Sequence, residues 1–145
     1  MQKLIIDNDV IADEFFEDVQ LLLGIQSTLE PHQFVWLVNK HFLYDFRYLA
    51  ESEIIVKKKS KHFKYPVFKC KEPHLEVAHY IYTNQHDGEY LLQEIKHLDY
   101  LWLLKGDRDE ELIKLLLSEM KSFEQLQLVT ELASEKIIHK QQLVL

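Results

Sequence analysis

The fold is decided by the stretch Leu75-Glu76-Val77-Ala78-His79-Tyr80-Ile81-Tyr82, which lies near the middle of the chain. Successive side chains of a β-strand point to opposite faces of the sheet, so an extended chain divides this stretch into two alternating sets. One set is Leu75, Val77, His79 and Ile81, and the other is Glu76, Ala78, Tyr80 and Tyr82. The alternation predicts a strand, and the segments on either side of it supply its predicted partners.

Strand-like segments flank this stretch on both sides. Before it, residues 44–48 alternate aromatic with charged side chains, as in a half-buried strand, and residues 62–69 alternate around Pro66. Because proline has no amide to donate, segment 62–69 is predicted to be an edge strand or to contain a bulge. After it, residues 84–88 predict a turn. The predicted strands are residues 19–25, 44–48, 54–56, 62–69, 75–82, 89–92 and 98–104.

Two helices are predicted, one on each side of the strand-rich segment. The first follows Ser27-Thr28-Leu29-Glu30, which has the spacing of a capping box, and runs to about Phe42. The second begins with a cap at Asp107–Glu110 and runs through Met120. The predicted apolar faces are Phe34, Leu37, Val38 and His41 in the first helix and Ile113, Leu116, Leu117 and Met120 in the second.

The segment near the C-terminus contains an element whose type the residues leave open. The leucines of residues 125–132 alternate as in a strand, but the apolar residues from Phe123 to Ala133 also fit the period of a helix. Residues 134–140 predict one helical turn.

The order of the predicted elements gives the fold class. The order β-α-β-β-β-β-α-β is typical of an α+β domain with a largely antiparallel sheet and two main helices. The length fits a single domain over residues 1–145. Residues 1–15 are acidic, and we expect them to form a loosely attached arm.

The composition excludes several classes of protein. The 145 residues include only three Gly and three Pro, too few for a collagen-like or linker-rich chain, and the 47% of hydrophobic residues is too high for intrinsic disorder. Cys70 is the only cysteine, so no disulfide within the chain is possible and nothing points to secretion. Residues 1–18 are acidic, unlike a signal peptide, and no apolar run reaches the roughly 18 residues of a membrane span. We therefore expect a cytoplasmic protein with no membrane partner.

The net charge of −7 is unevenly distributed along the chain. Residues 1–30 carry −6, residues 40–71 carry +6 and residues 72–145 carry −7. Because opposite charges attract, we expect the acidic N-terminal segment and the basic middle to approach each other, within one chain or across a dimer.

The segment 92–100, with the sequence LQEIKHLDY, resembles the nine-residue IPExxxVDY motif that names a bacterial family of small proteins. Three residues, Glu94, Asp99 and Tyr100, match the motif. The substituted positions are Leu92 for Ile, Gln93 for Pro and Leu98 for Val.

Two further stretches are similar to the general plan of the family. One is Leu23-Gly24-Ile25, followed by Leu29 and then by residues 36–40, and the other is the apolar segment Leu143-Val144-Leu145. The resemblance implies a strand over residues 125–132. It implies no particular reaction, cofactor or partner.

The residues that would hold a nucleotide, a metal or a reactive thiol are not arranged in a known pattern. Gly24, Gly88 and Gly106 are too far apart to build a glycine-rich phosphate loop. The eight histidines lack metal-ligand spacing, so neither a metal nor another cofactor is expected. Cys70 lies between two lysines that would lower the pKa of its thiol, but the favoured interpretation is a cysteine packed as a small hydrophobic residue.

The matched residues Glu94, Asp99 and Tyr100 have two interpretations. In the favoured one, Glu94 caps a turn, Asp99 accepts a hydrogen bond from a backbone amide, and Tyr100 packs with its hydroxyl bonded. In the alternative, the two carboxylates serve as acid and base in a small hydrolase or other ligand-binding enzyme, together with Tyr100 and a histidine. The alternative requires these groups to converge in one cleft.

The segment Lys57–Lys64 holds five lysines beside Phe63 and Tyr65, a pattern that also occurs in nucleic-acid-binding proteins. Lysines equally protect a sheet edge from aggregation, and the acidic pI of about 5.6 favours this second interpretation.

The sequence as a whole favours a non-enzymatic protein-interaction module, with a homodimer as its simplest form. The bases for this prediction are the segregated charge and the abundance of aromatic residues, with no assembled catalytic pattern beside them. Trp36 and Trp102 are the residues best suited to anchor an interface, although burial in the core is favoured for each.

Overall fold

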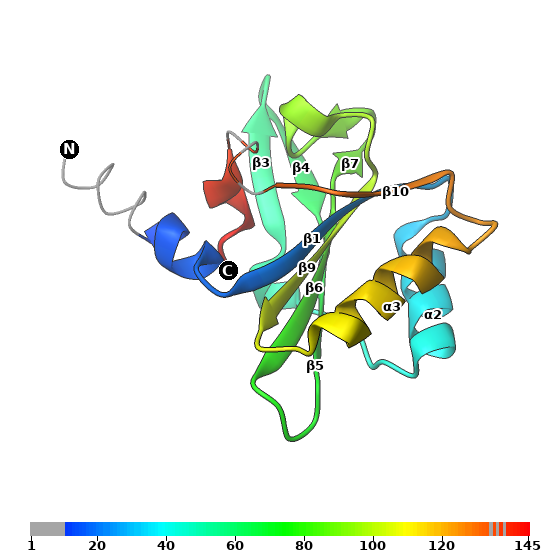
Figure 1. Cartoon of the computed structure of the whole chain (residues 1–145). Helices are drawn as coiled ribbons and strands as arrows, with labels where there is room; N and C mark the ends of the chain where they lie inside the picture. The colour runs from blue at the N-terminus through cyan, green and yellow to red at the C-terminus, as the bar shows by residue number, and fades with distance from the viewer. Residues whose placement is uncertain (1–10, 134, 136, 138) are drawn as a thin grey trace.

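The computed structural model describes residues 11–133, 135, 137 and 139–145, and it confirms the predicted α+β fold (Figure 1). The strands are β1 (Val19–Gln26), β2 (Arg47–Tyr48), β3 (Ile54–Lys58), β4 (Lys61–Tyr65), β5 (Val67–Lys71), β6 (Val77–Thr83), β7 (Gln85–His86), β8 (Glu89–Tyr90), β9 (Tyr100–Gly106) and β10 (Leu128–Glu131). The helices are α2 (Pro31–Phe42), α3 (Glu110–Lys121) and a short helix at residues 11–16. Single 3-10 turns are formed by Ala50–Ser52, Gln93–Ile95 and Lys140–Leu143.

Six strands form one antiparallel sheet in the order β10-β1-β9-β6-β5-β2. The strand β6 contains the alternating stretch that predicted the fold, and it pairs with β5 and with β9. Two separate hairpins, β3–β4 and β7–β8, complete the strand content of the described residues. The N-terminal strand β1 lies between β9 and β10, so its partners come from the far end of the sequence.

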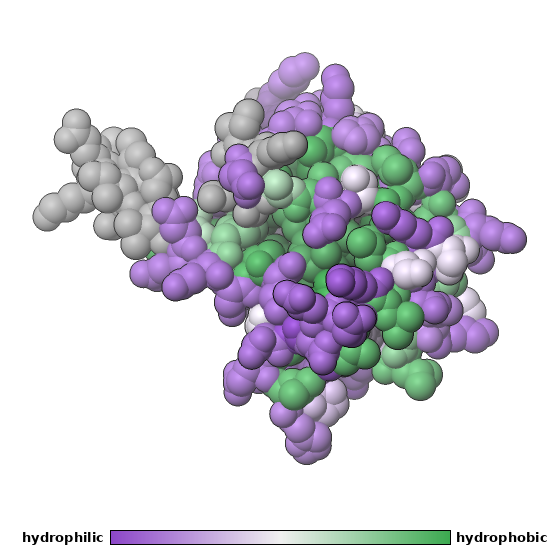
Figure 2. All heavy atoms as spheres, in the orientation of Figure 1, coloured by the Kyte–Doolittle hydropathy of each residue, from purple (hydrophilic) through white to green (hydrophobic). Residues whose placement is uncertain are grey.

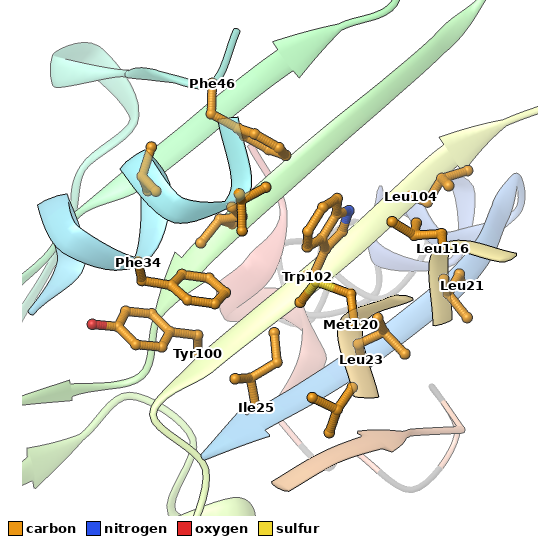
Figure 3. Close-up of a cluster of buried hydrophobic side chains, with 14 of the residues drawn as sticks. Leu21, Leu23, Ile25, Phe34, Phe46, Tyr100, Trp102, Leu104, Leu116 and Met120 are labelled. Atoms are coloured by element: carbon orange, nitrogen blue, oxygen red, sulfur yellow. The ribbon is translucent and has the colours of Figure 1, made fainter. Parts of the chain in front are cut away.

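Both faces of the sheet are covered, as Figure 1 shows, with α2 and α3 on one side and the helix at 11–16 and the C-terminal segment on the other. We call the apolar cluster under the two helices the helix-side core and the cluster on the opposite face the hairpin-side core. The helix-side core includes Phe34, Val38, Trp102, Leu116 and Met120 (Figure 3). The hairpin-side core includes Tyr65, Tyr82, Leu98, Leu101, Leu103 and Leu143.

The alternation along β6 assigns its residues to these two cores. Val77 and Ile81 belong to the helix-side core, whereas Tyr80 and Tyr82 belong to the hairpin-side core. Each set is buried, because segments cover both faces of this antiparallel sheet. The prediction of a strand with two alternating sides is therefore confirmed at the centre of the sheet.

The predicted cap of the first helix is wrong by three residues. The helix begins at Pro31, and the amide of Glu30 donates to Oε1 of Gln33 at 2.9 Å. Ser27 lies before the helix, and its hydroxyl accepts from the amide of Leu29 at 3.1 Å. Proline at the first helical position fixes its own backbone in the helical region and needs no amide partner, which places the boundary at residue 31.

The predicted cap of the second helix is also displaced, from Asp107 to Asp109. The Asp109 side chain accepts from the amide of Glu111 at 2.8 Å, and the helix then runs from Glu110 to Lys121. The side chain of Gln20 bonds both the amide and the carbonyl of Arg108, which holds the chain non-helical up to this residue.

Three predicted strands are shortened or divided, and one of them, 89–92, is reduced to the two residues of β8. Only residues 47 and 48 of the segment 44–48 form a strand, because the Asn39 side chain bonds the amide and the carbonyl of Phe46 and keeps this part out of the sheet. The segment 62–69 is divided at Pro66 between the hairpin strand β4 and the sheet strand β5. Proline cannot donate to either ladder, which explains the break.

The two ends of the described chain pack on the sheet. Residues 128–131 form the strand β10, which settles the open choice between helix and strand in favour of the strand. Part of the predicted turn at 134–140 lies outside the described residues. Of the predicted arm, residues 1–10 also lie outside them, whereas residues 11–15 belong to a helix in which Ala12 is buried. Within the described part of the chain, no helix has the length and hydrophobicity needed to cross a membrane.

Candidate functional site

Residues 91–99, which contain most of the motif-like segment, form the loop that joins β8 to β9, and the fully buried Asn84 holds it in place. The side-chain nitrogen of Asn84 donates to the carbonyl oxygens of Ile95 and Leu98 at 3.3 and 2.8 Å. Its side-chain oxygen accepts from the amide of Leu92 at 2.8 Å. These three bonds fix the path of the loop and direct Leu92 and Leu98 into the hairpin-side core.

Glu94 connects this loop to the C-terminal segment. Its Oε2 accepts from the backbone amide of His139 at 2.8 Å, and the His139 ring nitrogen Nδ1 lies 3.4 Å from Oε1. Partial burial acts to raise the pKa of Glu94, but hydrogen bonds from the two backbone amides and from the His139 ring outweigh it and lower the pKa below its usual value. Glu94 is therefore held as a carboxylate that joins two segments of the chain.

Asp99 and Tyr100 connect the beginning of β9 to the segment before α2. Oδ2 of Asp99 accepts from the amide of Ser27 at 2.9 Å, and the Tyr100 hydroxyl donates to the carbonyl of Leu29 at 2.6 Å. Burial, followed by the nearby charges of Asp99 and Glu30, raises the pKa of Tyr100 well above its ordinary value. Asp99 accepts from a backbone amide and the Tyr100 hydroxyl is bonded, as the structural interpretation predicts, but both partners are distant in the sequence. The predicted turn cap by Glu94 is wrong, since Glu94 bonds His139 instead.

The three matched residues do not come together at one place. Asp99 and Tyr100 line an open polar cleft of about 960 Å³, whereas Glu94 is absent from its lining and contacts His139 instead. The alternative enzyme hypothesis requires all three in one cleft, so its acid–base pair is not assembled here.

The cleft lies between the residues before α2, the adjoining ends of β6 and β9, and the β7–β8 hairpin. Four carboxylates line it against a single lysine, Lys64. Thr83 at the end of β6 also lines it, and although this residue is only 4% exposed, its hydroxyl has no hydrogen-bond partner among the described residues. The lining residues are Gln26, Ser27, Thr28, Leu29, Glu30, Pro31, Glu53, Lys64, Pro66, Thr83, Gln85, His86, Asp87, Gly88, Asp99, Tyr100 and Gln127.

A second polar cluster lies buried in the helix-side core. The indole nitrogen of Trp102 donates to Nδ1 of His79 at 3.0 Å, and Nε2 of His79 lies 2.9 Å from Oε2 of Glu72. Glu72 also pairs with Arg108 at 3.1 Å. Because an indole can only donate, Nδ1 of His79 must accept, which leaves the ring proton on Nε2.

This arrangement keeps His79 neutral. Burial lowers the pKa of His79, and the hydrogen bond to Glu72 only partly opposes this effect. Both ring nitrogens are occupied, so neither is available to take a proton from a substrate. The cluster therefore joins β6 and β9 to the segments that contain Glu72 and Arg108. It does not supply a catalytic base.

The other residues that the sequence pattern singled out occupy ordinary structural positions. Cys70 is buried in β5, and burial raises the pKa of its thiol, so the lowered pKa considered from the sequence is wrong and the packed cysteine is correct. Within the described residues, no three His, Cys, Asp or Glu side chains are placed to hold a metal ion.

The lysine-rich segment 57–64 belongs to the β3–β4 hairpin. Lys58 pairs with Glu89, and Lys61 pairs with Asp87. The interleaved aromatic rings of Phe63 and Tyr65 are buried, so they are not available to stack on bases. These ion pairs join the basic middle to the β7–β8 hairpin, and Asp18 of the acidic N-terminal segment pairs with Lys105.

The two predicted interface residues have opposite environments. Trp102 has no exposed surface, so it cannot contact another protein in this fold, and its predicted burial is confirmed. Trp36 is 61% exposed on α2, where Lys40 lies 4.7 Å from its ring, so the favoured burial of Trp36 is wrong.

Two exposed leucines line a groove beside α3, and a third lies next in sequence to two other lining residues. Leu112 and Leu115 on α3 are 42% and 54% exposed, and Leu43, which follows α2 with a left-handed backbone, is 89% exposed. Figure 2 shows apolar surface over this side of the molecule. The groove has a volume of about 300 Å³ and is lined by His41, Phe42, Tyr44, Leu104, Arg108, Leu112, Ile113, Leu115, Leu116 and Glu119.

Sequence reasoning missed Asn84, Thr83 and the Glu72–His79–Trp102 cluster. Asn84 was visible only as the beginning of a predicted turn, and its role arises from carbonyls 11 and 14 residues away. His79 gave the one local signal, since it is a polar residue on an apolar side of the β6 alternation.

Comparison of the chain with protein-family models, with curated proteins and with solved structures finds no match.

Proposed function

We propose that this protein is a non-enzymatic interaction module that associates with a second copy of itself through the groove beside α3. The observation that carries the proposal is the exposure of Leu112 and Leu115 in the lining of an apolar groove, with the exposed Leu43 next in sequence to two lining residues, because large apolar side chains grouped on a surface are typical of contact sites. The proposal includes a cytoplasmic location and membership of the IPExxxVDY family, which rests on the residues Glu94, Asp99 and Tyr100.

The backbone conformation of Leu43 supports the proposal that a partner covers its side chain. Leu43 has a φ of 58°, a conformation in which glycine is the usual residue after a helix. A leucine in this position costs backbone free energy and exposes apolar surface, so a free-standing chain gains nothing from it. A partner that covers the side chain would recover that cost.

The spacing of residues on α3 favours a second copy as the occupant. Two α3 helices packed antiparallel, with Leu112 against Leu115 of the second copy, are related by a two-fold axis, as in most homodimers. The same register sets Arg108 level with Glu119 of the second copy. Both residues border the groove, and within one chain Arg108 pairs with Glu72 and Glu119 lies 2.8 Å from His41. The register that pairs the leucines therefore brings these two opposite charges together in addition to their contacts within each chain.

The hydrogen bonds of the motif-like residues support a role other than catalysis. Glu94, Asp99 and Tyr100 each bond a backbone group, and these bonds join distant segments of the chain. Residues committed in this way stabilise a fold.

Sedimentation velocity between about 1 and about 100 µM tests the proposal, since the dimer fraction depends on concentration. We expect a species of twice the 17.4 kDa of the chain, which Leu115→Glu converts to the monomer because it places a charge in the apolar contact. Trp36→Ala is the matched control, since Trp36 is similarly exposed but lies outside the groove.

A wild-type protein that stays at 17.4 kDa over this range, at low and high salt, would contradict the proposal. Loss of the dimer in Trp36→Ala with retention in Leu115→Glu would also contradict it and would assign the interface to the outer face of α2.

A further inference from the structure

The polar cleft is separate from the groove beside α3. It lies at the Tyr100 end of β9, whereas the groove lies at the Leu104 end, and the two share no lining residue. The proposed self-association leaves the cleft without a role, and the cleft contains two features that stability does not explain.

The first feature is the hydroxyl of Thr83. Burying a hydroxyl without a hydrogen bond destabilises the folded state, so folded proteins rarely leave one unpaired. Thr83 is the register partner of Tyr100 across β6 and β9, so their side chains emerge on the same face of the sheet. Thr83 therefore lines the cleft together with Tyr100 and the adjoining Asp99, and its hydroxyl is buried at this end of β6.

The second feature is that the cleft lining has more negative than positive charge, with hydrogen-bond acceptors left unoccupied by the described residues. Asp99 and Glu30 line the cleft together with Tyr100, and their charges raise the pKa of Tyr100. A carboxylate has about four acceptor sites, and among the described residues a single hydrogen bond to Asp99 is formed, from the amide of Ser27. Lys64 is the one lysine or arginine in the lining, set against four carboxylates.

We propose that the cleft binds a small organic cation through a primary ammonium group, with Asp99 and Glu30 supplying the negative charge and the Thr83 hydroxyl accepting one hydrogen bond. An ammonium group has three donors and no acceptor, which complements two carboxylates and one unpaired hydroxyl. The remaining carboxylates, Glu53 and Asp87, belong to the same lining, so a second ammonium group on the same ligand has acceptors within the cleft.

Isothermal titration calorimetry with 1,4-diaminobutane tests this inference. We expect saturable binding to the wild-type protein, weakened roughly tenfold by Thr83→Val because one buried hydrogen bond is lost. Asp99→Asn is expected to weaken binding at least as much, because it removes the charge and keeps an oxygen that can accept from the Ser27 amide. Thr130→Val on β10, outside the cleft, is the matched control and should bind as the wild type does.

Thermal unfolding without ligand gives an independent readout. Thr83→Val should be at least as stable as the wild type, because valine has the same shape and removes an unpaired hydroxyl. A less stable Thr83→Val variant would overturn the inference, since it would mean that the hydroxyl already has a partner in the free protein.

Three titration results would also overturn it: no binding of the diamine, binding that neither Thr83→Val nor Asp99→Asn weakens, and equal binding of calcium or of a neutral polyol such as glycerol. The first two exclude the site, and the third excludes an organic cation as its ligand. Leu115→Glu changes the groove and leaves the cleft intact, so this variant should still bind 1,4-diaminobutane. Its titration therefore tests the cleft independently of the proposed dimer.

Discussion

The two faces of the sheet are buried to a similar degree but by different means. Two amphipathic helices cover the helix-side core, and their apolar residues follow a period that is visible in the sequence. The hairpin-side core is covered by the short helix at 11–16, the β3–β4 hairpin, the motif-like loop and the C-terminal segment, and apart from that short helix none of them has an α-helical repeat. Specific hydrogen bonds hold these covering segments instead, among them those of Asn84, Glu94 and Tyr82.

The difference shows that the degree to which a face is buried and the interactions that position its covering segments are separate properties. The helix-side core depends mainly on the volume and shape of its side chains, with one polar cluster at Trp102. The hairpin-side core depends in addition on a few polar side chains that direct irregular segments. Changes that remove volume should therefore dominate on the first side, and changes that remove a single polar group should be costly on the second.

Trp102→Ala should have the largest effect, because Trp102 is fully buried and also supplies the donor to His79. We expect a loss of about 4 kcal/mol in the free energy of unfolding, measured by urea denaturation. Trp102→Phe should lose about half as much, since it keeps most of the packing and removes the donor. A loss below about 1 kcal/mol in Trp102→Ala would contradict the role of volume on this side.

Asn84→Ala should have the next largest effect, because it removes three side-chain bonds that hold the motif-like loop. We expect a loss of about 3 kcal/mol and faster hydrogen exchange at the amide of Leu92. Asn84→Asp is the control that keeps an acceptor for this amide and should protect it better than alanine does. Unchanged exchange at Leu92 in Asn84→Ala would show that apolar packing alone holds the loop.

Tyr82 and Tyr65 provide a matched pair within the hairpin-side core. The Tyr82 hydroxyl donates to the carbonyl of Leu143 at 2.6 Å, whereas the buried Tyr65 hydroxyl has no partner among the described residues. Tyr82→Phe should therefore destabilise the protein by about 1 kcal/mol, and Tyr65→Phe should be neutral or stabilising. Equal losses in the two variants, measured by urea denaturation, would refute this distinction.

The smallest expected effect is the dependence of the free energy of unfolding on pH near neutrality. Its source is His79, beside Trp102 in the helix-side core. Burial lowers the pKa of His79 in the folded protein below its ordinary value of 6.5. The unfolded chain therefore takes up a proton at this site first as pH falls. The contribution of His79 is fully present above about pH 6.5 and is lost as pH falls towards the folded-state pKa.

Urea denaturation at pH 7 and at lower pH, in the wild type and in His79→Gln, measures this contribution. The wild type should lose more stability between the two pH values than the variant does. Equal losses would assign the pH dependence to other groups.

The comparison of the two faces also explains how far the sequence alone could predict the fold. Helix periodicity predicted α2 and α3 nearly to the residue at their C-terminal ends, and alternation predicted β6 and its partners. The cap of α2 was displaced by the local Pro31, whereas the cap of α3 was displaced because the distant side chain of Gln20 bonds Arg108. Long-range hydrogen bonds of this kind leave no pattern in a single sequence.

The candidate sites were less predictable than the fold. The sequence identified Asp99 and Tyr100, which line the cleft, but Thr83 gave no signal because its distinction is an unpaired hydroxyl that only packing reveals. The exposure of Trp36 was equally hidden, since its neighbours Phe34, Val35 and Val38 take the buried positions of α2. Only part of a helix surface can face the core, so when some residues of an apolar run are buried the others are left exposed.

The position of β1 has a consequence for the synthesis of the protein. This strand leaves the ribosome early, yet its neighbours β9 and β10 and the core residue Leu143 are translated much later. Its apolar run Leu21-Leu22-Leu23 therefore stays unpaired on the nascent chain while the middle of the protein is made. Folding is dominated by contacts between distant residues, so it is expected to be slow, and β1 completes its pairing only after residues 128–131 have been made.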